Sequence, residues 1–107
     1  MARPPLSPST TDAIETLATA IRGARIRRGW TVRQLAERVG VSHATISALE
    51  AGRPGVAIGT IFEAATLVGV PLFSTSNAER AAYGALKRTE LALLPATARP
   101  RPVDDDF

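Results

Sequence analysis

At 107 residues the chain has the length of one domain, or of one small domain with tails. It contains no cysteine, which excludes a disulfide framework and a thiolate metal site, and a single histidine leaves other metal sites short of ligands. The formal net charge is +3, but residues 22–53 hold seven arginines against two glutamates, a local balance of about +5. Such a basic patch suits a polyanion, and a solvated arginine-rich face is the alternative interpretation.

The N-terminal region predicts a disordered arm followed by a helix. Residues 1–11 (MARPPLSPSTT) are rich in proline and serine and do not have the pattern of a secretory signal. Asp12 and Glu15 match a capping box, so we expect the helix to begin at Asp12 and to run to about Arg28. Its buried stripe would consist of Ile14, Leu17, Ala18 and Ile21. No apolar run in the chain is long enough to cross a membrane, and we expect a cytoplasmic location.

Residues 31–53 predict two short helices joined by a tight turn. The first would run from Thr31 to Val39, with Thr31 and Gln34 as its capping box. Gly40 then permits the left-handed backbone that ends a helix, and Ser42 can cap a second helix from about His43 to Ala51. This is the layout of a helix-turn-helix, in which the second helix lies in the DNA major groove.

Two further helices and a tail complete the chain. One helix is expected at about Ile58 to Val68, with Ile58, Ile61, Phe62 and Ala65 on one face. Another would begin at Ser76, which forms a capping box with Glu79. Residues 89–94 (TELALL) either extend that helix or form a short strand, and residues 95–107 are a proline-rich flexible tail. The predicted organisation is therefore an arm (1–11), a DNA-binding domain with a dimerisation helix (12–94) and a tail (95–107).

The outward side of the second helix in the motif carries small side chains that would let it approach DNA closely. His43 and Ser47 have the chemistry to hydrogen-bond base edges, and Ala44 and Ala48 to meet a thymine methyl. For His43 the alternative is a solvated position at a helix start. Phosphate contacts are expected at the helix N-termini and from nearby side chains, namely Thr31, Ser42, Arg33, Gln34 and Arg53. For Arg25 we favour a buried ion pair with Glu50 over a DNA contact.

The last helix offers a face for a second copy of the chain. We expect two copies to associate through Ala81, Ala82, Ala85 and Leu86, or through Leu91 and Leu93 on paired strands. The alternative is that this face covers the core of its own monomer. The tail residues Val103, Asp104, Asp105, Asp106 and Phe107 could order on a partner, with Phe107 as an apolar anchor and the aspartates facing a basic surface. A solubilising end is the other interpretation.

Catalysis is not expected from this composition. The chain has one histidine, no phosphate-binding glycine-rich loop and no evident pair of catalytic carboxylates. We therefore predict neither an enzyme nor a small-molecule substrate, and neither a cofactor nor a metal.

Residues 12–73 resemble the Xre/Cro-type helix-turn-helix family, which has the lambda-repressor-like fold of phage repressors and many bacterial regulators. The resemblance rests on LA-x-x-x-GVS-x-x-x-IS-x-LE-x-G-R (Leu35 to Arg53) and on the helix ending LVGVPLF. It implies an all-α domain of five short helices that binds double-stranded DNA, and a homodimer on a palindromic operator. It also implies that DNA bases are contacted by His43, Ala44, Ser47 and Ala48. The DNA backbone would be contacted by Thr31, Thr45 and Arg53, and Arg25 would form an ion pair with Glu50. Val32 departs from the family, which often has a phosphate-binding glutamine there, and Arg33 is the expected substitute.

The remainder of the chain resembles the small regulators paired with HipA-type kinases. The segment GRPGVAIGTIFEAATLVGVPLF, a helix containing AER, an LLP motif and the final VDDDF carry this resemblance. It implies a HipB-like antitoxin that neutralises a HipA-like serine/threonine-kinase toxin and represses its own operon. The alternative is a stand-alone Xre-family repressor without a toxin partner.

Overall fold

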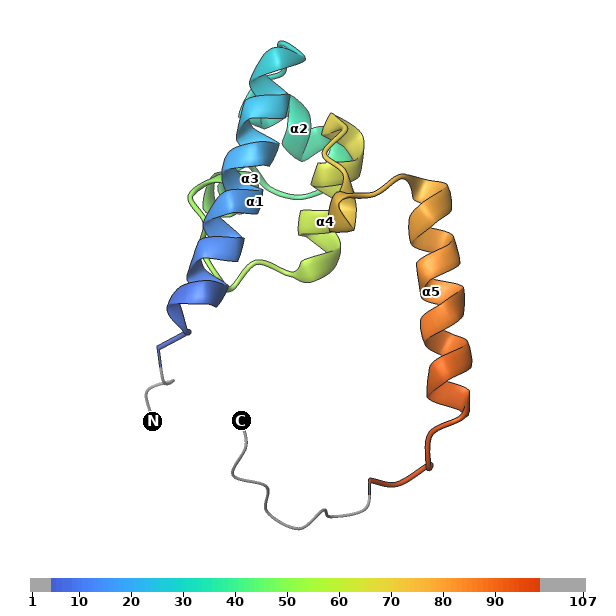
Figure 1. Ribbon diagram of the computed structural model, residues 1–107. Helices are drawn as coiled ribbons and strands as arrows, with labels where there is room; N and C mark the ends of the chain where they lie inside the picture. The colour runs from blue at the N-terminus through green and yellow to red at the C-terminus, as the bar shows by residue number, and fades with distance from the viewer. Residues whose placement is uncertain (1–4, 99–107) are drawn as a thin grey trace. The chain divides into compact units, whose positions relative to one another are not determined.

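A computed structural model describes residues 5–98 (Figure 1). Within this range it contains the helices α1 (Pro8–Arg27), α2 (Val32–Val39), α3 (His43–Glu50), α4 (Ile58–Val68) and α5 (Asn77–Ala92), a 3-10 turn η1 (Leu72–Ser74), and no strand. The predicted all-α fold of five helices is thus confirmed. The chain divides into two compact units, one ending at Ser74 and the other beginning at Thr75. No helix among the described residues is long and apolar enough to span a bilayer.

Helix α1 begins four residues before the predicted start at Asp12. Ser7 is its N-cap and accepts a hydrogen bond from the Thr10 N–H at 3.3 Å, and Pro8 occupies the first turn. A proline at the first helical position needs no hydrogen-bond donor and has a suitable φ, so the Ser-Pro pair starts the helix where we expected an arm. Residues 1–4 of that arm lie outside the described residues.

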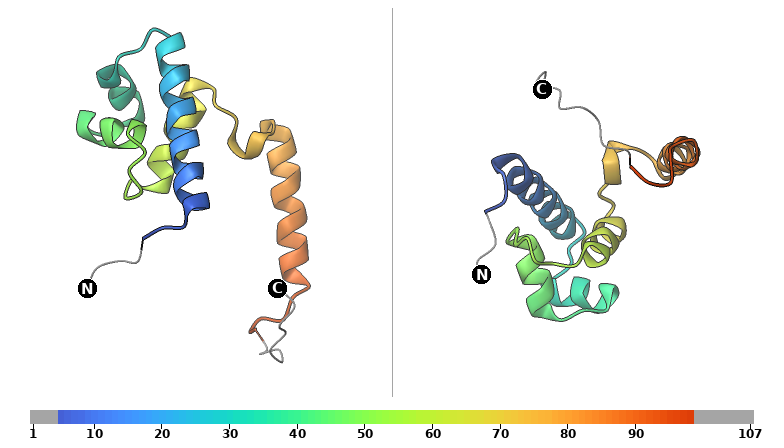
Figure 2. Two further views of the ribbon diagram at one scale, coloured as in Figure 1. Left: turned by 60° about the vertical axis from the view of Figure 1, so that its left-hand side comes forward. Right: turned by 90° about the horizontal axis from the view of Figure 1, so that it is seen from below.

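The helix-turn-helix forms as predicted. The Thr31 side chain accepts from the Gln34 N–H at 3.0 Å, while the Gln34 side chain accepts from the Thr31 N–H at 2.8 Å, which completes the capping box of α2. Gly40 ends α2 with a left-handed φ of 85°, a conformation that costs other residues about 1–2 kcal/mol. Ser42 caps α3 by accepting from the Thr45 N–H at 3.1 Å. Figure 2 shows α2 and α3 side by side at one edge of the first unit.

The core of the first unit lies between α1, α2, α3 and α4. Ile21, Leu35 and Ile46 are fully buried and come from α1, α2 and α3. Helix α4 adds the equally buried Ala64 and Ala65, whose small side chains let the helices approach closely. This packing fixes which side of α3 faces inward and therefore which side faces solvent.

The predicted face of α4 is partly wrong. Ile58 is 68% exposed rather than buried, and Ile61 and Phe62 are half-buried, whereas Ala64, Ala65 and Val68 face the core. The buried face is thus rotated from the one predicted, because the side chains that fit closest to α1 and α2 are the alanines. Phe62 instead meets Phe73 edge to face, with 6.4 Å between ring centroids.

Helix α5 forms most of the described part of the second unit and extends through the ambiguous segment. Residues 89–92 are helical and Leu93 is the C-cap, so the strand alternative for residues 89–94 is wrong. The predicted Ser76–Glu79 capping box is present, with the Glu79 N–H donating to Ser76 Oγ at 3.1 Å. No residue of α5 is buried. The predicted tail residues Val103 to Phe107 lie outside the described residues.

Candidate nucleic-acid interface

The interface is built on the outward side of α3. Ile46 and Leu49 are buried, so the helix presents the opposite side to solvent. His43, Ala44 and Ser47 are exposed there, and Ala48 is half-buried. Ala51, the helical C-cap, is exposed four residues after Ser47 and therefore continues the same face. The sequence interpretation omitted Ala51, although the same spacing would have found it.

An ion pair between α1 and α3 fixes the position of α3. Arg25 Nε and a terminal nitrogen donate to the two Glu50 carboxylate oxygens at 2.7 and 2.9 Å, and the other terminal nitrogen donates to the Trp30 carbonyl at 2.7 Å. The exposed fractions of the two side chains are 10% and 7%. The hydrogen bonds and charge of Glu50 raise the pKa of Arg25, against the opposing effect of burial. Arg25 therefore has the structural role that we favoured from the sequence.

The N-terminus of α3 leaves a hydroxyl group free to contact a phosphate. Ser42 Oγ and Thr45 Oγ1 lie 2.8 Å apart and form a hydrogen bond in which either can donate. Because each hydroxyl carries one hydrogen, the acceptor in that bond keeps its own for another partner. Ser42 is exposed and Thr45 half-buried, so Ser42 is the more accessible of the two.

The N-terminus of α2 is arranged in a similar way. The capping box uses the Gln34 side-chain oxygen, so both hydrogens of its amide nitrogen remain available to an acceptor. Arg33 is exposed beside it, whereas Val32 is half-buried against the core. Val32, which stands where the resembled family often has glutamine, therefore packs against the core. The polar groups at this end of α2 are those of Thr31, Arg33 and Gln34.

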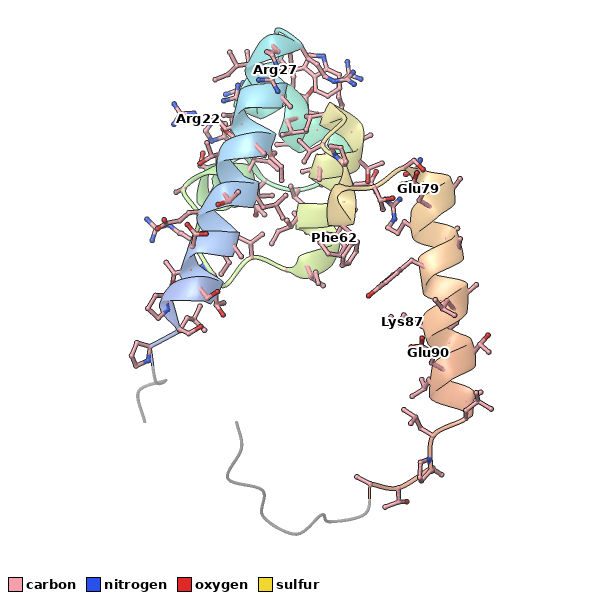
Figure 3. The ribbon with its side chains drawn as sticks, in the orientation of Figure 1. Arg22, Arg27, Phe62, Glu79, Lys87 and Glu90 are labelled. Atoms are coloured by element: carbon pink, nitrogen blue, oxygen red, sulfur yellow. The ribbon has the colours of Figure 1, made fainter. Side chains whose placement is uncertain are left out.

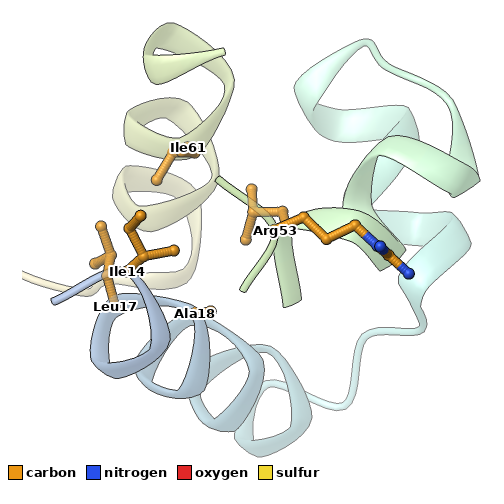
Figure 4. A pocket seen from close by; sticks show the side chains of 6 residues that line it. Ile14, Leu17, Ala18, Arg53 and Ile61 are labelled. Carbon is orange, nitrogen blue, oxygen red and sulfur yellow. The ribbon is translucent and has the colours of Figure 1, made fainter. Parts of the chain in front are cut away.

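Arg53 follows α3 on a turn that depends on Gly52. Gly52 has a φ of 74°, and a Cβ there would lie 3.4 Å from the Glu15 side chain of α1. The Arg53 N–H then donates to the Ala48 carbonyl at 3.1 Å, which ties the turn to α3. The stem of Arg53 borders an apolar cavity of about 50 Å³ lined by Ile14, Leu17, Ala18, Leu49 and Ile61. Its guanidinium points away from those apolar side chains (Figure 4).

This arrangement agrees with the comparisons with known proteins. A family model described as a helix-turn-helix domain matches residues 16–82, more than half of the chain. The chain belongs to the helix-turn-helix domain family. It is also 37% identical over 59 residues to the HTH-type transcriptional regulator SutR of Escherichia coli strain K12. That match covers 55% of this chain but only 33% of SutR. No solved structure gives a significant match.

The matched region contains α2 and α3, the two helices of the helix-turn-helix described above. The structure brings most of the predicted DNA-contacting residues to the ends and outward sides of α2 and α3. Trp30 is half-buried, and the guanidinium carbons of Arg38 and Arg28 lie 4.1 and 5.4 Å from its ring centroid. Arg22 and Arg27 lie on the exposed side of α1 (Figure 3).

Proposed function

We propose that two copies of this helix-turn-helix protein bind a palindromic operator and repress transcription. The observation that supports this most directly is the outward side of α3, where His43, Ala44 and Ser47 are exposed and no acidic side chain competes with phosphate. Glu50, the one charged residue of α3, is held by Arg25. The hydroxyl, amide and guanidinium groups of Thr31, Arg33, Gln34, Ser42, Thr45 and Arg53 would bind the DNA backbone on either side.

The proposed dimer forms through α5. Ala78, Ala82, Ala85, Thr89 and Ala92 follow one another at steps of four, three, four and three residues, which is the spacing of a coiled-coil seam. Ala81, Leu86 and Leu93 widen this apolar face. Within its own unit the helix buries none of its 16 residues, and a helix of that length is marginal alone in water, so it needs a surface to pack against. Leu91 follows Ala85 by six residues and lies about 120° round the helix, outside this face.

Sedimentation can test the α5 interface with a matched pair of variants. Ala85→Glu introduces a charge on the seam and should give a monomer. Leu91→Glu introduces the same charge on the same helix away from the seam and should leave the dimer intact. Equal behaviour of the two variants would contradict the proposed face.

A dimer would place two α3 helices one DNA turn apart, about 34 Å, or a multiple of it. Footprinting on the DNA upstream of the chain's own gene tests this spacing. The expected result is two protected half-sites related by a twofold axis, with affinity falling steeply as salt rises, because arginines displace counterions from phosphates. Protection without sequence preference would contradict the proposal.

We further propose that the protein is an antitoxin for a HipA-like kinase. The support is the sequence from Gly52 to Phe73 together with the acidic and aromatic end, Asp104 to Phe107. A pull-down with the kinase encoded beside the gene should retain the full chain and lose most binding when Phe107→Ala and Asp104→Asn are combined. Unchanged kinase binding would remove the tail from the mechanism.

The second candidate function is a stand-alone repressor. The match to SutR favours it, because that relative is named as a transcriptional regulator. Gene neighbourhood separates the two functions at little cost. If no kinase-like gene lies adjacent, the antitoxin proposal loses most of its support, while the operator-binding proposal is unaffected.

A further inference from the structure

The DNA-facing side of α3 lacks the side chains that usually distinguish bases by paired hydrogen bonds. Arginine and lysine bind guanine in this way, and asparagine and glutamine bind adenine. Helix α3, with the sequence HATISALE, contains none of these four residue types. Its exposed polar side chains near the DNA are His43 and Ser47, each with a single group to offer one base edge.

The same side of α3 carries three alkyl groups. The methyl groups of Ala44, Ala48 and Ala51 lie on it, and they flank Ser47 along the helix. A side chain of one carbon allows the helix backbone to approach the floor of the groove more closely than a long side chain would. The chemical group that alkyl side chains contact in the major groove is the pyrimidine 5-methyl, which thymine carries and cytosine lacks.

We propose that the alanines of α3 recognise pyrimidine 5-methyl groups, so that the operator is distinguished largely by where it carries them. This proposal rests on the proposed operator binding. Duplex DNA as the ligand follows from the helix-turn-helix family, and the alanines determine only which part of the duplex α3 can recognise. A consequence follows for DNA modification: 5-methylcytosine presents the same methyl group as thymine, so cytosine methylation at a contacted position strengthens binding.

The expected effect can be stated as a change in affinity. Removing one buried methyl group weakens binding about fourfold at 25 °C. A palindromic operator contains each contacted thymine twice, so the symmetric replacement should weaken binding about 16-fold. The effect should be confined to positions beneath α3 and should be absent in the flanking sequence.

The experiment changes the DNA and leaves the protein intact. An operator selected from random duplexes is resynthesised with deoxyuridine replacing thymidine at one symmetric position at a time, and binding is measured for each duplex. In a second series, cytosine and 5-methylcytosine are compared at the positions that responded. Thymidines outside the footprint are the matched control.

Protein variants then assign the contact. Ala44→Gly, Ala48→Gly and Ala51→Gly each remove one methyl group from this side. The ratio of the affinities for thymidine and deoxyuridine should shrink towards unity at one position in at least one of them. Thermal unfolding and affinity for nonspecific DNA check that each variant folds.

Three outcomes separate the possibilities. A position-specific loss on deoxyuridine substitution, reversed by 5-methylcytosine and diminished in a glycine variant, supports the proposal. Equal affinity for all deoxyuridine duplexes, or a difference that persists in full in all three glycine variants, overturns it while operator binding stands. Failure to select any preferred sequence overturns the proposed function itself.

Discussion

Replacing Glu50 with alanine should destabilise the first unit strongly, because it leaves Arg25 charged and almost buried. In the wild type the guanidinium makes two bonds to the carboxylate and a third to the Trp30 carbonyl. Removing one partner of a buried pair costs about 3–5 kcal/mol. A domain of this size has a free energy of unfolding of roughly 5–10 kcal/mol, so most of the stability would be lost. A loss of 3 kcal/mol would lower Tm by about 12–24 °C.

The double variant Arg25→Met, Glu50→Leu should be more stable than Glu50→Ala alone. It removes both charges and fills similar volume, and its main remaining cost is the Trp30 carbonyl left without the Arg25 donor, about 1–3 kcal/mol. Denaturant unfolding of the wild type, Arg25→Met, Glu50→Leu and the double variant, which share the same two substitutions, gives the coupling energy directly.

The chain contains a matched control for this cycle. Lys87 and Glu90 on α5 form an ion pair at 3.1 Å, but about half of each side chain is exposed. Glu90→Ala should therefore cost less than about 0.5 kcal/mol. A stability of Glu50→Ala within about 1 kcal/mol of the wild type would contradict the structural role of the Arg25–Glu50 pair. So would a double variant that lost as much stability as the two single variants together.

Three further predictions follow from single positions. Gly40→Ala should lower the free energy of unfolding, measured by denaturation, by about 1–2 kcal/mol. A Cβ at position 40 meets no neighbouring atom, so the cost comes from the left-handed backbone alone. An unchanged free energy of unfolding would contradict this backbone conformation. Arg53→Ala should weaken binding to all DNA sequences similarly, and should reduce the slope of log binding constant against log salt concentration by about 1 per half-site. Arg22→Ala on α1 should leave this slope unchanged. A slope for Arg53→Ala equal to that of the wild type would exclude Arg53 from phosphate contact. Hydrogen bonds from Thr75 and from the Ser76 N–H lower the pKa of Glu79. The contribution of the Glu79 carboxylate to the α5 cap is thus complete above the unfolded pKa of about 4.3 and is lost as the pH falls through the lower folded pKa. NMR titration of Thr75→Ala should show that the pKa of Glu79 rises. An unchanged pKa would contradict the assigned effect of the Thr75 hydrogen bond.

Local signals in the sequence predicted the element boundaries well where a single capping pattern was available. Thr31 with Gln34, and Ser76 with Glu79, each form the expected box, because among the neighbouring cap-forming residues only these are followed by Gln or Glu three positions later. The predicted box at Asp12 failed because Ser7 and Pro8 start the helix earlier, a combination that resembled an arm by composition alone.

The buried face of a helix was harder to predict than its ends, because tertiary packing decides which of several neighbouring apolar residues is buried. Ile58 has the spacing of a core residue but is exposed, since alanines of α4 occupy the closest contacts. Hydropathy alone does not show which of two apolar sides of α4 packs closely against the neighbouring helices. For α3 the buried Ile46 and Leu49 left a single possible outward side, so most of its candidate contacts could be named from the sequence.

A thiol introduced on the outward side of α3 tests whether this side lies against DNA. Because the chain has no cysteine, Ser47→Cys places one reactive group on this side, and Thr16→Cys places a matched group on the exposed surface of α1. Operator DNA should slow alkylation at position 47 in proportion to occupancy and leave position 16 unaffected. Equal alkylation rates at position 47 with and without saturating operator would contradict it.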